Sequence, residues 1–301
     1  MTLTIFIYIA LFAFVFFTVT KAIAFAKMPM HSRWEIYPVP KEKYKGSYGG
    51  SYYEEVKWYE KPRDASLYNE IKEMLKEILF IKMLYENQRP LWWFSYALHL
   101  GIYLLLLWTI MLFVGAISEL NGIPVTAVNS HPWASLVFYL TILFGGLGAL
   151  LLTIGSAALF LRRIFIKSLK NYTTYQDYFN LLFIFAVAVS GLVIWFNDLA
   201  FNYGRTVFTS LLTFSPIEAD PALTRHILLV GLLILYIPQT KMSHYVGKYF
   251  AFHKVLWENE PNLPGSVIEK KVREGAKIKP KTTWSAPHWQ PYESKSKDTL
   301  S

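Results

Sequence analysis

Long apolar runs alternate with charged connections along this chain. Continuous apolar runs of about 20 residues match the helical length that crosses a hydrocarbon core of roughly 30 Å. Apolar and polar residues do not alternate within the runs, which excludes the strands of a membrane β-barrel. The pattern predicts an all-α polytopic membrane protein, a bundle of five transmembrane helices. We expect the helices at residues 3–25, 92–117, 134–161, 179–201 and 223–246.

The composition agrees with this class and limits the chemistry. Of the 301 residues, 53% are hydrophobic and only 17% are charged, which is too apolar for an ordinary soluble domain. The chain contains no cysteine, so its own side chains form no disulfide, thiolate zinc site or iron–sulfur cluster. The first helix lacks a basic start and a cleavage motif, which favours a retained helix over a signal peptide.

The distribution of Lys and Arg predicts the orientation. Twelve of the 30 lie between the first two helices, four lie between the third and fourth, and 11 lie from Lys241 onward. Since basic residues collect on the cytoplasmic side, we expect an outside amino terminus and a cytoplasmic carboxyl terminus, in the cell (cytoplasmic) membrane. The net charge of +9 then reflects topology, and we expect no nucleic acid partner.

Four regions follow from these boundaries: the first helix at 1–27, a cytoplasmic loop at 28–90, a four-helix membrane part at 91–250 and a cytoplasmic tail at 251–301. In the loop, "ASLYNEIKEMLKEILFIKMLY" repeats its apolar residues at helical spacing. This amphipathic helix either lies on the membrane lipid, docks a partner or packs on its own bundle. The tail is rich in Pro, Lys and Trp, and we expect it to be an extended arm that docks on another subunit.

Three of the seven histidines lie in predicted membrane helices: His99, His226 and His244. Ionisable groups are costly in a bilayer, so each is a functional candidate. In a continuous helix, 18 residues make five turns, which predicts His226 and His244 on one face about 27 Å apart. His99 and His244 are expected at similar depth near the cytoplasmic side, the geometry of a bis-histidine haem b. The alternative is an isolated hydrogen bond for each histidine.

The motifs "RHILLVGLLILYIPQTKMSH" and "ALHLGIYLLLLW" resemble the fifth and second helices of the respiratory nitrate reductase gamma subunit family. The resemblance covers roughly residues 85–250 and includes the five-helix order. It implies that His99 and His244 ligate a haem b near the cytoplasm and that His226 is one ligand of an outer haem.

One position departs from the family pattern. The second helix of the family carries another histidine ten residues after the first, and here this position is Thr109. Either His131 or Met111 substitutes as the ligand, or only one haem binds and His226 works at a quinone site. The sequence thus predicts one haem b, leaves a second haem open, and makes Thr109 and His131 candidates for the quinone site.

The long loop and tail resemble the membrane cytochromes of the sulfite-reductase-linked (Dsr) complex and of membrane-bound heterodisulfide reductase. That resemblance implies a cytoplasmic iron–sulfur partner subunit of heterodisulfide-reductase-like type. We expect the chain to exchange electrons between a menaquinone-type quinol and this partner through haem b, in an oxidoreductase complex. Arg225, Arg89 and Lys241 are placed to pair with haem propionates or to anchor the helix ends. The alternatives are a proton-conducting or transport subunit and a haem-free membrane anchor.

Overall fold

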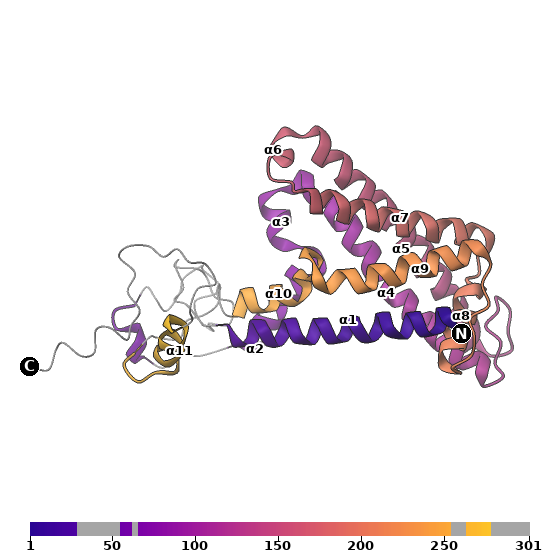
Figure 1. Ribbon diagram of the computed structural model, residues 1–301, viewed down its shortest axis with the longest axis horizontal. Coiled ribbons are helices and arrows are strands. Elements are labelled where there is room, and N and C mark those ends of the chain that lie inside the picture. The colour runs from indigo at the N-terminus through magenta and orange to yellow at the C-terminus, as the bar shows by residue number, and fades with distance from the viewer. Residues whose placement is uncertain (29–54, 62–65, 254–262, 278–301) are drawn as a thin grey trace, which may run out of the picture. The chain divides into compact units, whose positions relative to one another are not determined.

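The computed structural model describes residues 1–28, 55–61, 66–253 and 263–277. In these ranges every regular element is a helix (Figure 1), which confirms the predicted all-α class. The five predicted membrane-length helices are confirmed as well. They are Thr2–Lys27, Arg89–Leu120, Pro132–Phe165, Tyr175–Asn197 and Pro221–Gln239.

The chain divides into two compact units. The first consists of Met1–Phe17 and Leu75–Met242, and the second of Thr18–Met74 with the residues from Ser243 onward. Four long helices of the first unit form its bundle, and each lies against the next in chain order (Figure 1). These helices are α4 (Arg89–Leu120), α5 (Pro132–Phe165), α7 (Tyr175–Asn197) and α9 (Pro221–Tyr236).

Local sequence signals set the first turns of these helices. Thr174 and Asp177 form a capping box at the start of α7, in which each side chain satisfies a backbone N–H group of the first turn. The Asp220 carboxylate accepts hydrogen bonds from the backbone nitrogens of Ala222 and Leu223, at 2.7 and 2.8 Å, at the start of α9. Pro221 follows as the first helical residue, where its missing N–H costs nothing.

Helix α8 (Asn202–Leu212) was not predicted from the sequence. It connects α7 to α9 and packs against α4. The first unit also contains the start of α1 (Thr2–Lys27), whose Thr4 hydroxyl donates to the Ser215 carbonyl at 3.0 Å. The same hydroxyl accepts from the Ile217 nitrogen at 3.2 Å, so α1 is fixed to the segment that follows α8.

The fifth predicted helix does not continue to residue 246, and this expectation was wrong. Helix α9 ends at Tyr236 and is followed by the 3₁₀ turns η3 (Ile237–Gln239) and η4 (Lys241–Ser243). Pro238 has no N–H for the helical hydrogen bond and interrupts the helix, and the backbone of Thr240 is extended. His244 begins a separate helix, α10 (His244–Ala251), so His226 and His244 do not share one face of an unbroken helix.

The predicted loop helix is two helices, α2 (Leu67–Phe80) and α3 (Lys82–Asn87). Ile81 between them has a φ of 51°, a left-handed conformation that stops a right-handed helix. Most of residues 28–65 of the predicted loop, and most of the 251–301 tail that was predicted to dock, lie outside the described residues. The remaining elements are η2 (Trp58–Glu60), α6 (Lys167–Lys170) and α11 (Val267–Ala276).

Candidate haem and quinol site

His99 lies on α4 in the first unit and is half-buried. Its Nδ1 atom lies 2.7 Å from the carbonyl oxygen of Ser95, one turn earlier in the same helix. A carbonyl oxygen only accepts hydrogen bonds, so the ring hydrogen of the neutral imidazole is on Nδ1 and the lone pair is on Nε2. A histidine that binds a metal through Nε2 ordinarily has its Nδ1–H held in this way.

Helices α4 and α5 approach each other very closely beside His99. A Cβ atom added to Gly101 of α4 would lie 2.6 Å from the Leu152 nitrogen of α5. One added to Gly155 of α5 would lie 2.5 Å from the Leu98 nitrogen of α4. Leu98 and Leu152 are buried together in one apolar cluster. Backbone therefore packs on backbone here, and this fixes α4 beside His99.

His226 lies on α9 and faces α7. Its Nδ1 atom lies 2.8 Å from the Ser190 hydroxyl oxygen, and the Ser190 hydroxyl itself donates to the Val187 carbonyl at 2.8 Å. Serine has one hydrogen to donate, so when it bonds to the Val187 carbonyl the imidazole is the donor in the Ser190–His226 bond. In that arrangement the His226 lone pair is on Nε2, as in His99. Gly191 makes room for the ring, since a Cβ there would lie 3.1 Å from the His226 Cε1 atom.

His244 belongs to the second unit, where it is exposed at the start of α10. The residue before it, Ser243, is buried and accepts a hydrogen bond from the Lys21 ammonium group of α1 at 2.7 Å. Since His99 is in the first unit, the pairing of His99 with His244 on one iron stays a prediction.

Two of the three basic residues expected at haem propionates are bound to other side chains. The Arg89 guanidinium donates to the Tyr85 hydroxyl and stacks 4.4 Å from the Tyr85 ring centre. Lys241 forms an ion pair with Asp177 at 3.3 Å. Arg225 is exposed on α9 next to His226.

The candidates for the quinone site and for the second axial ligand of an outer haem are Thr109, His131 and Met111. Thr109 is exposed on α4, and its hydroxyl donates to the Leu105 carbonyl at 2.8 Å. His131 is exposed directly before α5, where its backbone nitrogen donates to the Asn129 side chain at 2.9 Å. Met111 is half-buried on α4. The second axial ligand of an outer haem thus stays a prediction.

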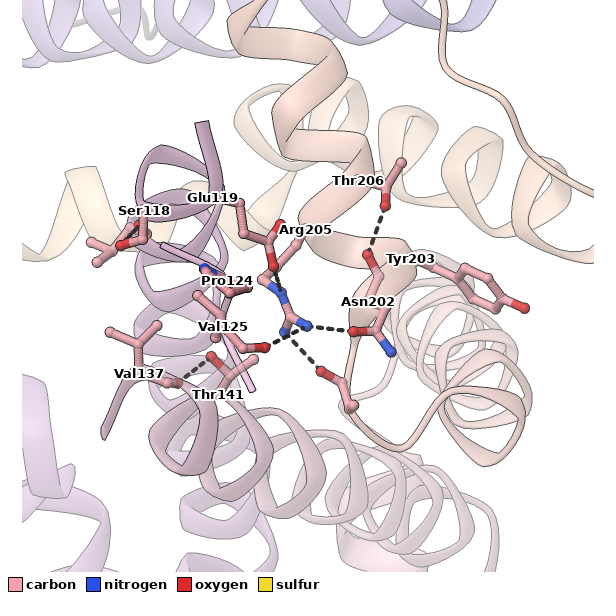
Figure 2. Close-up of polar contacts among 12 residues, drawn as sticks. Ser118, Glu119, Pro124, Val125, Val137, Thr141, Asn202, Tyr203, Arg205 and Thr206 are labelled. Carbon is pink, nitrogen blue, oxygen red and sulfur yellow. Dashed lines mark hydrogen bonds and ion pairs between the residues drawn. The ribbon is translucent and has the colours of Figure 1, made fainter. Parts of the chain in front are cut away.

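The sequence did not predict the structural role of one buried arginine. Arg205 on α8 is only 2% exposed, and its Nε atom donates to the Glu119 carboxylate at 2.9 Å. Its terminal nitrogens donate to the carbonyls of Ala200 and Val125 and to the Asn202 side chain (Figure 2). This one side chain joins the end of α4 to two loops. The available signal was an arginine beside a glycine in a short connection that otherwise lacks basic residues.

Ser190 was also missed, and its signal was a hydroxyl within the apolar run of α7.

Helix bundles build cofactor sites from side chains on facing helices, and here His99 and His226 lie on two of the membrane-length helices. Residues 82–256 match the nitrate reductase gamma subunit family. The match covers more than half of the chain, and the chain belongs to this family.

The family defines the general class of function. Its members are membrane cytochrome b subunits of respiratory complexes that bind haem b and interact with quinol. No curated protein and no solved structure matches the chain. By its family and its five membrane-length helices, the protein is a multi-pass membrane subunit of a respiratory complex.

Proposed function

We propose that this subunit exchanges electrons between a membrane quinol and a cytoplasmic iron–sulfur protein, with haem b held by His99 and His244. The observation that carries the proposal is the bond from His99 Nδ1 to the Ser95 carbonyl, which leaves the Nε2 lone pair suited to an axial iron ligand. When bound, haem b supplies one-electron transfer. His244 is exposed at the start of α10, after the Pro238 break.

His226 is assigned to the outer end of the bundle, either as the ligand of a second haem or as a base for quinol. Oxidation of a quinol to a quinone releases two electrons and two protons. His226 can take one proton on Nε2, the nitrogen that the Ser190 bond leaves unprotonated. His131, exposed at the start of α5, is the second proton acceptor, and Thr109 completes the candidate quinone site. Arg225 would pair with a haem propionate.

The partner and orientation follow from the sequence. The basic connections favour an outside amino terminus and a cytoplasmic tail in the cell membrane. Because this chain contains no cysteine to hold a cluster, a separate subunit must carry the iron–sulfur centre, and the proposed orientation favours a cytoplasmic one. A heterodisulfide-reductase-like iron–sulfur subunit and a menaquinone-type quinol are the proposed partners.

The test is a reduced-minus-oxidised absorption spectrum of the purified protein. We expect low-spin haem b bands in the wild type and their loss in His99→Ala and in His244→Ala, because each variant removes one axial ligand. His253→Ala is the matched control, since His253 pairs with Glu70 at 2.6 Å and is not a proposed ligand. Unchanged bands in His244→Ala, or no bands in the wild type, would contradict the proposal.

A further inference from the structure

Helix α2 is amphipathic, but its apolar side is the exposed one. Leu75, Ile78 and Leu79 are 48%, 42% and 41% exposed, respectively. Leu67, Tyr68 and Ile71 are exposed on the same face, because residues three and four apart line one side of a helix. A helix in contact with water ordinarily has the opposite arrangement, with its apolar face on the protein.

The polar side of α2 is the more buried one. Glu77 is only 6% exposed, and its carboxylate accepts a hydrogen bond from the Met83 nitrogen at 2.8 Å. Met83 lies in the first turn of α3, where backbone N–H groups lack partners within the helix. Glu73 and Lys76 on this side are half-buried. The protein thus satisfies the polar face of α2 and leaves the apolar face outside.

The last turn of α2 is hydrogen-bonded to the transmembrane helix α4. The Trp92 indole nitrogen donates to the Phe80 carbonyl at 2.7 Å. The Tyr103 hydroxyl donates to the Ile78 carbonyl. Tyr103 is 11 residues beyond Trp92, or about 16 Å further along the helix, within the apolar run of α4. The exposed apolar residues near Ile78 therefore adjoin the part of α4 that faces lipid.

Aromatic residues surround this junction. The Tyr96 ring stacks on Trp92 with ring centres 4.7 Å apart and on Phe80 at 6.3 Å. Tyr85 contacts Trp92 edge-on at 5.0 Å, and Trp93 is 60% exposed. Clusters of Trp and Tyr are typical of the depth at which membrane helices cross from hydrocarbon to head groups.

We infer that α2 lies in the interface of the bilayer at the Arg89 end of α4, with its exposed apolar face among the lipid acyl chains. The lipid surface is favoured over a protein partner because the apolar face continues the lipid-facing surface of a membrane-spanning helix. A lipid surface also explains why the apolar face of α2 is exposed and its polar face is buried, since lipid accepts the apolar side chains and the protein supplies hydrogen bonds to the polar ones.

The absence of cysteine makes a direct test available. A cysteine introduced into this chain is its sole site for a thiol-reactive fluorophore. Leu75→Cys and Leu79→Cys place the label on the apolar face, and Glu73→Cys places it on the opposite face as the matched control. Each variant is reconstituted in phosphatidylcholine nanodiscs with spin-labelled phosphatidylcholine as the lipid quencher and iodide as the aqueous quencher.

We expect the lipid quencher to reduce fluorescence at residues 75 and 79 at least twofold more than at residue 73, and iodide to show the reverse order. Equal access of iodide to all three positions would overturn the inference, because the apolar face would then lie in water. Shielding of residues 75 and 79 from both quenchers would also overturn it, because protein would then cover this face. The measurement needs no haem, so its outcome is separate from that of the proposed electron-transfer function.

Discussion

Two regions of the four-helix bundle, one around Arg205 and His226 and the other around His99, differ in the contacts that hold them. In the region that contains Arg205 and His226, side chains join segments far apart in sequence, through the Arg205–Glu119 and Ser190–His226 hydrogen bonds. In the region that contains His99, backbone packs on backbone at Gly155, and the imidazole bonds to its own helix. Side-chain hydrogen bonds thus hold Arg205 and His226, whereas the close approach of α4 and α5 beside His99 depends on glycine.

This difference separates the two imidazoles, although both bond through Nδ1. The Ser95 carbonyl is one turn before His99, so its position is set wherever α4 is helical. The Ser190 hydroxyl belongs to α7, so its bond to His226 exists only while α7 and α9 are packed. We expect the His99 geometry to survive changes in the bundle that abolish the His226 geometry.

The largest effect is expected from Arg205→Met. The variant removes four hydrogen bonds and leaves the Val125 and Ala200 carbonyls without their donor. Loss of one partner of a buried ion pair commonly costs about 3–5 kcal/mol, and we expect about 3 kcal/mol here because the Glu119 side chain is 33% exposed and can be hydrated. Thermal unfolding in detergent, followed by tryptophan fluorescence, measures the change.

Lys170→Met is the control for this variant, because it removes an exposed cation at the end of α6. We expect its unfolding temperature to equal that of the wild type. A similar loss in both variants would show that net charge, and not the Arg205 contacts, sets the stability of this region.

A smaller effect is expected from Gly155→Ala in the other region. The new methyl group would lie 2.5 Å from the Leu98 nitrogen, and two backbones cannot yield as a flexible side chain can. Overpacking of this kind costs about 1–3 kcal/mol. Gly247→Ala is the matched control, because among the described residues its methyl group would meet the Phe25 ring at an ordinary contact distance of 3.7 Å. A neutral Gly155→Ala variant in the same unfolding assay would contradict close backbone packing beside His99.

The sequence predicted the elements that depend on length and polarity alone. Five apolar runs gave five membrane-length helices, because a run of this length has one stable conformation in lipid. It did not predict where the fifth helix ends. Pro238 was visible, but a proline is also compatible with a kinked helix that continues, and only the extended Thr240 decides against it.

The site was predictable to a similar extent. Histidines in apolar helices stand out because such residues are rare there, and this signal made His99 and His226 candidates. Their hydrogen-bond partners were not equally accessible. Ser95 follows from helical spacing, whereas Ser190 and Arg205 form hydrogen bonds with residues 36 and 86 positions away in the sequence. No local pattern encodes such a pairing, which depends on how the helices pack.

The smallest effect on stability, and the most direct test of the difference between the two imidazoles, is expected from Ser190→Ala. Loss of one neutral hydrogen bond costs about 1 kcal/mol, but the His226 ring would also lose the acceptor that holds its hydrogen on Nδ1. In ¹⁵N NMR of histidine-labelled protein, the His226 signals, assigned by their loss in His226→Gln, should change from one tautomer to a mixture.

Ser156→Ala is the matched control for this measurement. The Ser156 hydroxyl is fully buried, but it donates to the Leu152 carbonyl of its own helix at 2.7 Å. Its removal should leave the His226 tautomer unchanged, and neither variant should alter the His99 signals, because the Ser95 carbonyl is part of the α4 backbone. A His226 tautomer that is unchanged in Ser190→Ala would show that α9 itself sets the ring hydrogen, and the distinction between a local and a tertiary imidazole would be lost.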